Sequence, residues 1–572
     1  MNRALPFNQW VDWGLLATLA TGLPLLNAWL GFPLPATFDG LYSAFGGVIP
    51  YSDAGGYFGG SYQFNNVGYL NYWNMRRPIN ALFLAFRLKI TDGNFWYMIV
   101  IQAALCAVAL TLYLRTLQKN IGTLAAFIAL GVFYYYAQSY IHTTMSETLG
   151  LTLGTLSFVL LWNGFLNKNR LIFNTGIASL TVALSTRAGP NFIVPALFLL
   201  VYLKPFTSSK LKDLFWFALS VVIPFVFMTM LSSLFEDPNT PGAPLSNFSY
   251  TLYGLVNGGK TWLFAFQDPY TIQLLEGKTE AQQAIILYAK SWEIFRDNPL
   301  ALFIGMVNYF GGFVYWFIRQ LAFGSGIIKG LTTTVAIIFW SFITYRIYTK
   351  RFSFQQEFLF LSIAFLGIAA SSCIIWKDGG IRVFAVAIPF IGALMGFAFS
   401  AASSQPQKSK TPENIGAACL VGTIILSAIL TPFIPSFSNQ KPPDITNINV
   451  NKTPDEEIFL TYKPSIQPYL MLDNAPGLHF WTLDPLQTQA RKSVYEDSPF
   501  GIELNNIAIQ YSNSNFTLLE IYDYISNSHK FIISDKNILN INSQWVIITG
   551  DFIDKDKKTI YKANNYLEFV QK

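Results

Sequence analysis

Residues 147–166 read ETLGLTLGTLSFVLLWNGFL, one acidic residue followed by 19 residues without a charge. A helix needs about 20 mainly apolar residues to cross the hydrocarbon core of a bilayer. The stretch therefore predicts a transmembrane helix that begins at Glu147. An ionisable side chain at such a position is costly unless it is paired or functional, so Glu147 is also a candidate site residue.

Similar stretches recur over most of the chain. The 572 residues are 52% hydrophobic and 12% charged, whereas soluble domains carry about 25% charged residues. Apolar runs occur at about 12–32, 95–114, 121–140, 147–166, 171–186, 190–203, 213–235, 300–322, 331–345, 357–376, 382–401 and 415–434. They predict an all-α polytopic membrane protein with about 11 to 13 transmembrane helices. The first run lacks a cleavage pattern and is interpreted as a retained span.

Basic residues mark one side of the membrane. They follow or precede alternate ends of the runs: Arg3, Arg115, Lys119, Lys168, Arg170, Lys204, Lys210, Arg346, Lys350, Arg351 and Lys408. The positive-inside rule assigns these ends to the cytoplasm and places residues 33–94, residues 236–299 and the C-terminus outside. The run 300–322, with two adjacent glycines and Arg319, is expected to be interfacial or re-entrant.

Three parts are predicted along the chain: a transmembrane domain over 1–435, a linker over 436–458 and a small extracytoplasmic α/β domain over 459–572. The linker is rich in Pro, Asn and Asp, and the last part alternates short apolar and polar stretches. Residues 441–572 hold 12 basic and 16 acidic residues, and the remainder holds 26 basic and 16 acidic residues. This excess of positive charge is typical of cytoplasmic loops and does not indicate nucleic-acid binding.

Metal and disulfide chemistry find little support. The three cysteines lie in apolar runs without ligand spacing, and His142 stands alone in its part of the sequence. No cofactor is expected to be required, and a divalent metal stays possible but unsupported.

The first outer loop contains an acid and two arginines. PYSDAGGY at 50–57 carries Asp53 and Tyr57, and Arg76 and Arg77 precede a proline and an apolar helix. Arginines neutralise a phosphate with paired hydrogen bonds, and a carboxylate can take a proton from an acceptor hydroxyl. A phosphate-bearing lipid substrate would use both. The alternative is that Asp53 caps a turn and the arginines anchor the chain at the interface.

Four more candidates lie at outer ends of the runs: Glu147 in HTTMSETLGL, Arg187 in STRAGPNF, Lys260 in YGLVNGGKTW and Arg382 in KDGGIRVFAVAIPF. Each has an alternative role. Glu147 could simply favour the first turn of a helix. Lys260 could belong to an ordinary loop, and the two arginines could extend to the membrane interface. The glycines before Lys260 let backbone N–H groups approach an anion.

The order of these motifs resembles that of the C-type membrane glycosyltransferases, which use lipid-phosphate sugars. The motifs are an early-loop Asp, RRP before an apolar helix, SE at the fourth run, TRAGP after the fifth and GGIRVFAVAIPF near the end. The nearest families in pattern are the protein O-mannosyltransferases of glycosyltransferase family 39 and the lipid A aminoarabinose transferases. The resemblance covers about residues 1–435.

The resemblance implies individual roles. Asp53 matches the catalytic acid of the family, Glu147 a second acid of the cavity, and Arg77 and Arg382 the donor-phosphate ligands. Arg76 and Lys260 are further candidates for the phosphate, and Tyr57 and Arg187 for the substrate cavity. Ala54 stands where the mannosyltransferases often carry Glu, and Val383 stands where the family has Tyr. These departures argue against a strict protein-mannosylating role.

The expected function is transfer of a sugar from a polyprenyl-phosphate donor to a hydroxyl of a lipid, glycan or protein, with inversion and with Asp53 as base. The expected location is the inner membrane of a bacterium. Two alternatives stay open, a polymerase or ligase that uses a diphosphate-linked glycan and a lipid or sugar transporter. A transporter predicts charges near the middle of spans and paired repeats, whereas the ionisable residues here gather at one face.

Overall fold

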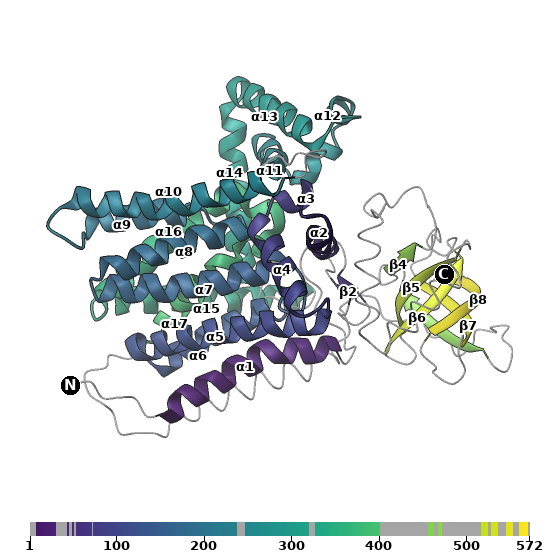
Figure 1. Ribbon diagram of the computed structural model, residues 1–572, viewed down its shortest axis with the longest axis horizontal. Coiled ribbons are helices and arrows are strands. Elements are labelled where there is room, and N and C mark those ends of the chain that lie inside the picture. Colours follow the sequence, from purple (N-terminus) through teal and green to yellow (C-terminus); the bar gives the residue numbers. More distant parts are fainter. Residues whose placement is uncertain are drawn as a thin grey trace.

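The computed structural model describes most of the chain to residue 400 and the strands of the C-terminal part (Figure 1). The described residues are 7–29, 43–44, 49–50, 53–70, 72–236, 246–319, 326–400, 456–462, 467–471, 516–523, 528–535, 545–552 and 560–569. The apolar run at 415–434 and all but the last three residues of the predicted linker lie outside them. The boundaries of the linker stay a prediction.

The first part of the chain is helical. Its helices are α1 (Phe7–Trp29), α2 (Asp53–Val67), α3 (Tyr72–Met75), α4 (Pro78–Ile90), α5 (Phe95–Ile121), α6 (Thr123–Ala137), α7 (Ser146–Leu166), α8 (Arg170–Thr186), α9 (Ile193–Leu203), α10 (Lys210–Leu234), α11 (Ser246–Val256), α12 (Pro269–Leu275), α13 (Glu280–Asp297), α14 (Pro299–Arg319), α15 (Gly326–Lys350), α16 (Gln355–Gly379) and α17 (Ile388–Phe397), with the 3₁₀ helices η1 (Trp262–Phe266) and η2 (Gly380–Ala387). Figure 1 shows α1, α5, α7, α8 and α10 packed alongside one another, with α2, α3 and α4 near one end of them.

Six helical segments of the described chain are long and apolar enough to cross a membrane, judged by length and composition. They are Tyr97–Ile121, Ser146–Leu166, Lys210–Leu234, Pro299–Ile318, Leu331–Lys350 and Gln355–Phe397. The all-α polytopic fold is thus confirmed, and the chain is an integral membrane protein. These six are counted over the described residues alone, which leave out the run at 415–434, and Gln355–Phe397 covers two of the predicted runs. Other apolar runs form shorter helices, such as α6 with 15 residues and α9 with 11.

The run at 300–322, which was expected to be interfacial or re-entrant, forms the continuous helix α14 as far as Arg319. By length and composition Pro299–Ile318 belongs among the candidate spans. The adjacent glycines do not interrupt the helix. Gly312 lies against the indole of Trp376, where a Cβ atom would be 2.5 Å from Nε1, so this glycine provides room for a packing contact.

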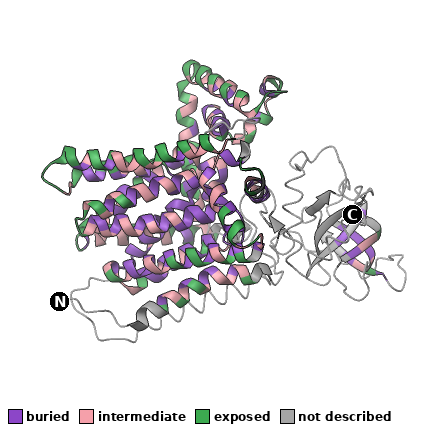
Figure 2. Ribbon diagram, in the orientation of Figure 1, coloured by how far each residue is buried: buried purple, intermediate pink, exposed green. Residues whose placement is uncertain are grey.

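Helix α7 lies at the centre of the bundle, and Figure 2 shows it largely buried while α10 is largely exposed. Two glycines of α7 allow close packing. A Cβ atom at Gly154 would lie 2.6 Å from the carbonyl oxygen of Val386 in η2, and one at Gly164 would lie 2.4 Å from the backbone nitrogen of Phe173 in α8. Larger side chains would separate these elements, because protein interiors leave little spare volume.

A break in the last apolar stretch brings η2 onto α7. Helix α16 ends at Gly379, and Gly380 has a φ of +56°, which glycine tolerates without strain. The following 3₁₀ segment is eight residues long, whereas such runs rarely exceed about four residues. It ends at Ala387, and α17 follows with Pro389 in its first turn. The Tyr113 hydroxyl donates a 2.6 Å hydrogen bond to the Pro389 carbonyl.

The predicted outer loop at 236–299 contains a small lobe of helices. Helix α13 packs on α11 and begins with a capping box between Thr279 and Gln282. Asp268 caps the short helix α12. The carboxylate of Glu280 forms an ion pair with Arg76, which joins the lobe to the turn between α3 and α4.

The described C-terminal residues form a six-stranded sheet. Its strands are β3 (Glu457–Tyr462), β4 (Gln467–Met471), β5 (Phe516–Asp523), β6 (Ser528–Asp535), β7 (Trp545–Phe552) and β8 (Ile560–Phe569). Their order is β3-β7-β8-β6-β5-β4, and only the β6–β8 pair is parallel. A two-stranded ribbon, β1 (Ser43–Ala44) and β2 (Ile49–Pro50), precedes α2. Strand β3 begins at Glu457, inside the predicted linker, and the bounds of the predicted C-terminal α/β domain stay a prediction.

Candidate functional site

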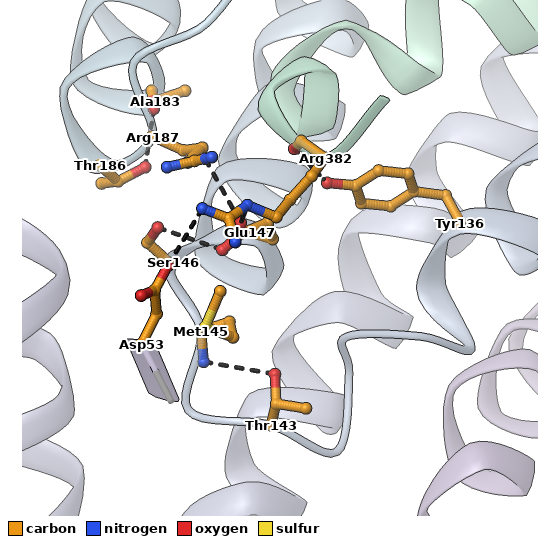
Figure 3. A network of polar contacts seen from close by, with 10 residues as sticks. All are labelled: Asp53, Tyr136, Thr143, Met145, Ser146, Glu147, Ala183, Thr186, Arg187 and Arg382. Carbon is orange, nitrogen blue, oxygen red and sulfur yellow. Dashed lines mark hydrogen bonds and ion pairs between the residues drawn. The ribbon is translucent and has the colours of Figure 1, made fainter. Parts of the chain in front are cut away.

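Four predicted site residues from four segments meet in one network (Figure 3). Asp53 is the first residue of α2, and Glu147 lies in the first turn of α7. Arg187 follows the last residue of α8, and Arg382 lies in η2. The predicted convergence of these residues on one site is thus present in the structure.

Arg382 connects the two acids. Its Nη2 atom lies 3.1 Å from Oδ2 of Asp53, and its Nε atom lies 3.0 Å from Oε1 of Glu147. A guanidinium group presents its N–H donors in a rigid plane, which suits contacts with two carboxylates at once. Arg382 therefore fixes the position of Asp53 relative to Glu147.

Glu147 is enclosed. Its side chain is 0% exposed, and its Oε1 atom also lies 3.4 Å from Nε of Arg187. The Ser146 hydroxyl donates a 3.2 Å hydrogen bond to Oε2. A buried charge needs partners of this kind to offset lost hydration. Burial is the largest single effect on Arg187 and lowers its pKa, but Glu147, with smaller contributions from Tyr57 and Asp378, raises the pKa of Arg187 above its ordinary value.

Asp53 is the accessible acid of the pair, since 28% of its side-chain surface remains exposed. Arg382 contacts Oδ2 of Asp53, whereas Oδ1 has no hydrogen-bond partner among the described residues. Tyr57 follows one helical turn later on α2 and is buried. Asp53 can therefore meet a substrate while Glu147 cannot do so without rearrangement.

Two further residues hold this arrangement by contacts to the backbone, and the sequence interpretation missed both. The Thr144 hydroxyl donates a 2.7 Å hydrogen bond to the carbonyl of Ala54, next to Asp53. The Tyr136 hydroxyl donates a 2.7 Å hydrogen bond to the Arg382 carbonyl. Neither forms part of a recognisable motif, because a hydroxyl that binds a distant carbonyl leaves no sequence pattern.

Arg77 lies near the network and has unused donors. Its Nη1 atom donates a 2.7 Å hydrogen bond to the Arg76 carbonyl, whereas its Nε atom is buried without a hydrogen-bond partner among the described residues. Burial lowers the pKa of Arg77, and Tyr57 opposes that shift. The Nη2 atom of Arg187 is likewise buried without such a partner. Buried guanidinium donors of this kind are suited to an anionic ligand.

The other two predicted phosphate ligands are placed differently. Arg76 forms its ion pair with Glu280, which also accepts a hydrogen bond from the Ser246 hydroxyl. Lys260 is exposed after two glycines with positive φ, and its ammonium lies 5.8 Å from the ring centroid of Phe264. Within the described part of the chain, no ion pair joins Arg76 or Lys260 to the acids of the network.

The region around Lys260 contains a second cation that the sequence interpretation did not single out. The ammonium of Lys377, near the end of α16, donates a hydrogen bond to the Gly259 carbonyl. The Tyr309 hydroxyl donates a 2.8 Å hydrogen bond to the Lys260 carbonyl. These contacts hold the glycine loop in place against α14 and α16.

Among the described residues, no group of three or more His, Cys, Asp or Glu side chains could hold a metal ion. The network instead combines one accessible carboxylate with two guanidinium groups, and Arg77 adds a third guanidinium group nearby. Such a set can accept a proton and stabilise negative charge on a phosphate.

Comparison with known proteins gives a fold likeness at long range. No family model matches the sequence, and no curated protein matches it. Among the solved structures that match are two of ArnT from Cupriavidus metallidurans. The apo structure has 12% identity and a TM-score of 0.28 and covers 67% of this chain and 76% of that chain. The structure bound to undecaprenyl phosphate has 12% identity and a TM-score of 0.29 and covers 74% of this chain and 81% of that chain.

Proposed function

We propose that this protein is a membrane glycosyltransferase that moves a sugar from a polyprenyl-phosphate donor to an acceptor hydroxyl at the outer face of the membrane. The observation that carries the proposal is the Asp53 carboxylate, partly exposed and held at 3.1 Å by Arg382 beside further guanidinium groups. The polyprenyl carrier is the one that the family resemblance implies.

Asp53 serves as the general base. It accepts the proton of the acceptor hydroxyl while that oxygen attacks the anomeric carbon of the donor. The bond between this carbon and the phosphate oxygen breaks, and its electron pair stays on the phosphate. A single displacement of this kind inverts the anomeric centre. The phosphate is a good leaving group, so the step needs no general acid.

Arg77, Arg187 and Arg382 stabilise the departing phosphate. Arg77 and Arg187 have buried N–H groups without partners among the described residues, and these can bind phosphate oxygens. Removing one donor from such an electrostatic site costs about 10²–10³ in rate.

Glu147 acts through the arginines. Because it is fully buried and paired with Arg187 and Arg382, we assign it a positioning role rather than contact with the sugar. The outer face follows from the basic residues at the opposite ends of the helices. The same topology places the C-terminal sheet outside the cytoplasm. The membrane that holds the protein is, in this proposal, the inner membrane of a bacterium.

The test is sugar transfer by the purified protein in detergent or lipid, with a panel of radiolabelled polyprenyl-phosphate sugars and one diphosphate-linked glycan. We expect one monophosphate donor to be consumed and turnover by Asp53→Asn to fall by about 10²–10⁴. Asp92→Asn is the matched control, because Asp92 is exposed at the turn between α4 and α5 and tolerates the same change.

Equal turnover by native protein and Asp53→Asn would overturn the role of Asp53. Use of the diphosphate-linked donor alone would favour a polymerase or ligase.

A further inference from the structure

Arg87 is a buried cation on α4, and no acidic side chain of the described chain forms an ion pair with it. Arg87 is 1% exposed. Burial lowers the pKa of Arg87 to about 9, so it remains charged at neutral pH. A buried charge without a counter-charge is unfavourable, and its presence needs an explanation in terms of its contacts.

The contacts of Arg87 lead to one amide. Nη1 of Arg87 donates a 2.6 Å hydrogen bond to Oε1 of Gln102 in α5 and a 3.2 Å hydrogen bond to the Met98 carbonyl. A guanidinium group has donors only, so the oxygen of the Gln102 amide has to face it. The charge on Arg87 therefore determines which way the amide points.

The fixed amide then holds the segment that precedes α7. Nε2 of Gln102 donates two hydrogen bonds of 3.0 Å, one to the Ile141 carbonyl and one to the Thr143 carbonyl. If the amide of Gln102 flipped by 180°, its oxygen would face both carbonyls and these two hydrogen bonds would be lost. Residues 141–145 thus depend on Gln102 for their tertiary contacts to α5.

The same segment positions both acids of the site. Thr144 holds the Ala54 carbonyl at 2.7 Å, directly after Asp53, and α7 begins at Ser146, directly before Glu147. Figure 3 shows Thr143 and Met145 on the chain that leads to Glu147, with Asp53 beside it. A shift of this segment would change the separation of the two carboxylates.

We infer that Arg87 and Gln102 form a buried positioning pair that sets the geometry of Asp53 relative to Glu147 through residues 141–145. The inference rests on the proposed function, in which Asp53 is the base. Arg87 and Gln102 touch no reacting atom and act through this segment.

The central test is Arg87→Met. If Arg87 served stability alone, Arg87→Met would leave the buried Oε1 of Gln102 without its donor and lower the thermal midpoint, but turnover by the folded protein would be unchanged. A positioning role predicts that kcat falls by about 10- to 100-fold while the donor KM changes by less than about twofold. Arg87→Lys keeps a charged donor for Gln102 and should recover part of the loss.

The chain offers a matched control at the opposite end of α5. Arg115 is also buried and donates a 2.8 Å hydrogen bond to a glutamine, Gln118. Arg115→Met makes the same chemical change without touching residues 141–145, and its kcat should stay within about twofold of native. A similar loss in both variants would show a general effect of removing a buried arginine and would overturn the inference.

A double variant tests whether the two residues act as one unit. Gln102→Leu alone should lose as much kcat as Arg87→Met, and the double variant should lose no more than Gln102→Leu. Multiplied losses would contradict the pair. If Arg87→Met does not fold, Gln102→Leu and Arg87→Lys carry the same comparison.

Hydrogen exchange separates this inference from the proposed function. Peptides covering residues 141–145 should exchange at least about tenfold faster in Arg87→Met than in native protein or Arg115→Met. This result, with no donor consumed by native protein, would leave the positioning pair standing and reject the glycosyltransferase. Unchanged exchange and native kcat in folded Arg87→Met would reject the positioning pair alone.

Discussion

Nη2 of Arg382 lies 3.1 Å from Oδ2 of Asp53, although 329 positions separate the two residues in the sequence. The contact joins the first outer helix to the broken segment η2 near the end of the helical part. Because the same guanidinium also faces Glu147, the placement of the proposed base depends on one residue of η2.

Arg382→Lys should therefore lose most of the transferase activity. A lysine ammonium is a single point charge and cannot reproduce contacts through Nε and Nη2 to two carboxylates. We expect kcat to fall by about 10²–10³, measured as transfer from the donor identified with native protein. Arg296→Lys is the control, because Arg296 is exposed on α13 and remote in sequence from the network. Activity of Arg382→Lys near that of the control would refute the bridging role.

Arg76 and Arg77 should differ sharply although they are neighbours. Arg77 has a buried Nε without a partner among the described residues, whereas Arg76 pairs with Glu280 of the outer lobe. We expect Arg77→Gln to lose about 10²-fold in kcat/KM.

For Arg76→Gln, the loss should be smaller and should match that of Glu280→Gln, since both break the same ion pair. Transfer kinetics over a range of donor concentrations compare the three variants. Equal losses in Arg76→Gln and Arg77→Gln would restore Arg76 as a second phosphate ligand.

Glu147→Gln should mainly destabilise the protein. It removes the counter-charge of Arg187 and Arg382 in a site where the carboxylate is 0% exposed. Breaking a buried pair by removing one partner costs about 3–5 kcal/mol. Thermal unfolding in detergent should show a lower midpoint, and Arg187→Met in the same background should recover part of it. A midpoint like that of native protein would mean that the two arginines need no counter-charge here.

The sequence identified the membrane helices and the candidate site residues, but not the contacts between those residues. Apolar runs such as 147–166 are long enough to identify a span by hydrophobicity alone, and charge at their ends identified Asp53, Glu147 and Arg382. The partners of these residues could not be predicted, because the contacts join segments that are distant in the sequence, by 329 positions for Asp53 and Arg382. Tyr136 and Gln102 bind backbone carbonyls, which every residue possesses, and so they carry no pattern.

The way the last described apolar stretch is divided could not be predicted, for a local reason. Hydrophobicity does not reveal where a helix ends, and the last described apolar stretch is divided into α16, which ends at Gly379, the 3₁₀ segment η2, and α17, which begins at Ile388. This break is what turns Arg382 toward the acids. A sequence that reads as one more span thus contains the segment that assembles the site.

Gly154→Ala should disturb the site without changing any polar residue. The added Cβ would lie 2.6 Å from the Val386 carbonyl oxygen and would push η2, which carries Arg382, away from α7. Overpacking of this kind costs about 1–3 kcal/mol, and turnover should fall with the thermal midpoint.

Gly311→Ala is the matched helical control for this glycine. A Cβ at Gly311 meets nothing within 4 Å, so the change should be neutral or stabilising by up to about 1 kcal/mol. If Gly154→Ala behaves like Gly311→Ala in both stability and turnover, the close packing of η2 on α7 is not required.

His142 should make the folded protein sensitive to mild acid. It lies between α6 and α7, outside the candidate spans, and burial lowers its pKa to about 4. In the unfolded chain a histidine binds its proton near a pH of about 6.5. Between these values unfolding takes up a proton, so stability is lost as the pH falls from about 6.5 toward 4.

The expected loss from this one group is about 2 kcal/mol between a pH of about 7.5 and a pH of about 5. Thermal unfolding of native protein and His142→Gln at both pH values isolates the contribution of His142 to this loss, because other groups titrate equally in the two proteins. His142→Gln cannot bind the proton in either state, so its midpoint should fall less on acidification. Parallel pH profiles for the two proteins would show that His142 is protonated in the folded state as readily as in the unfolded chain.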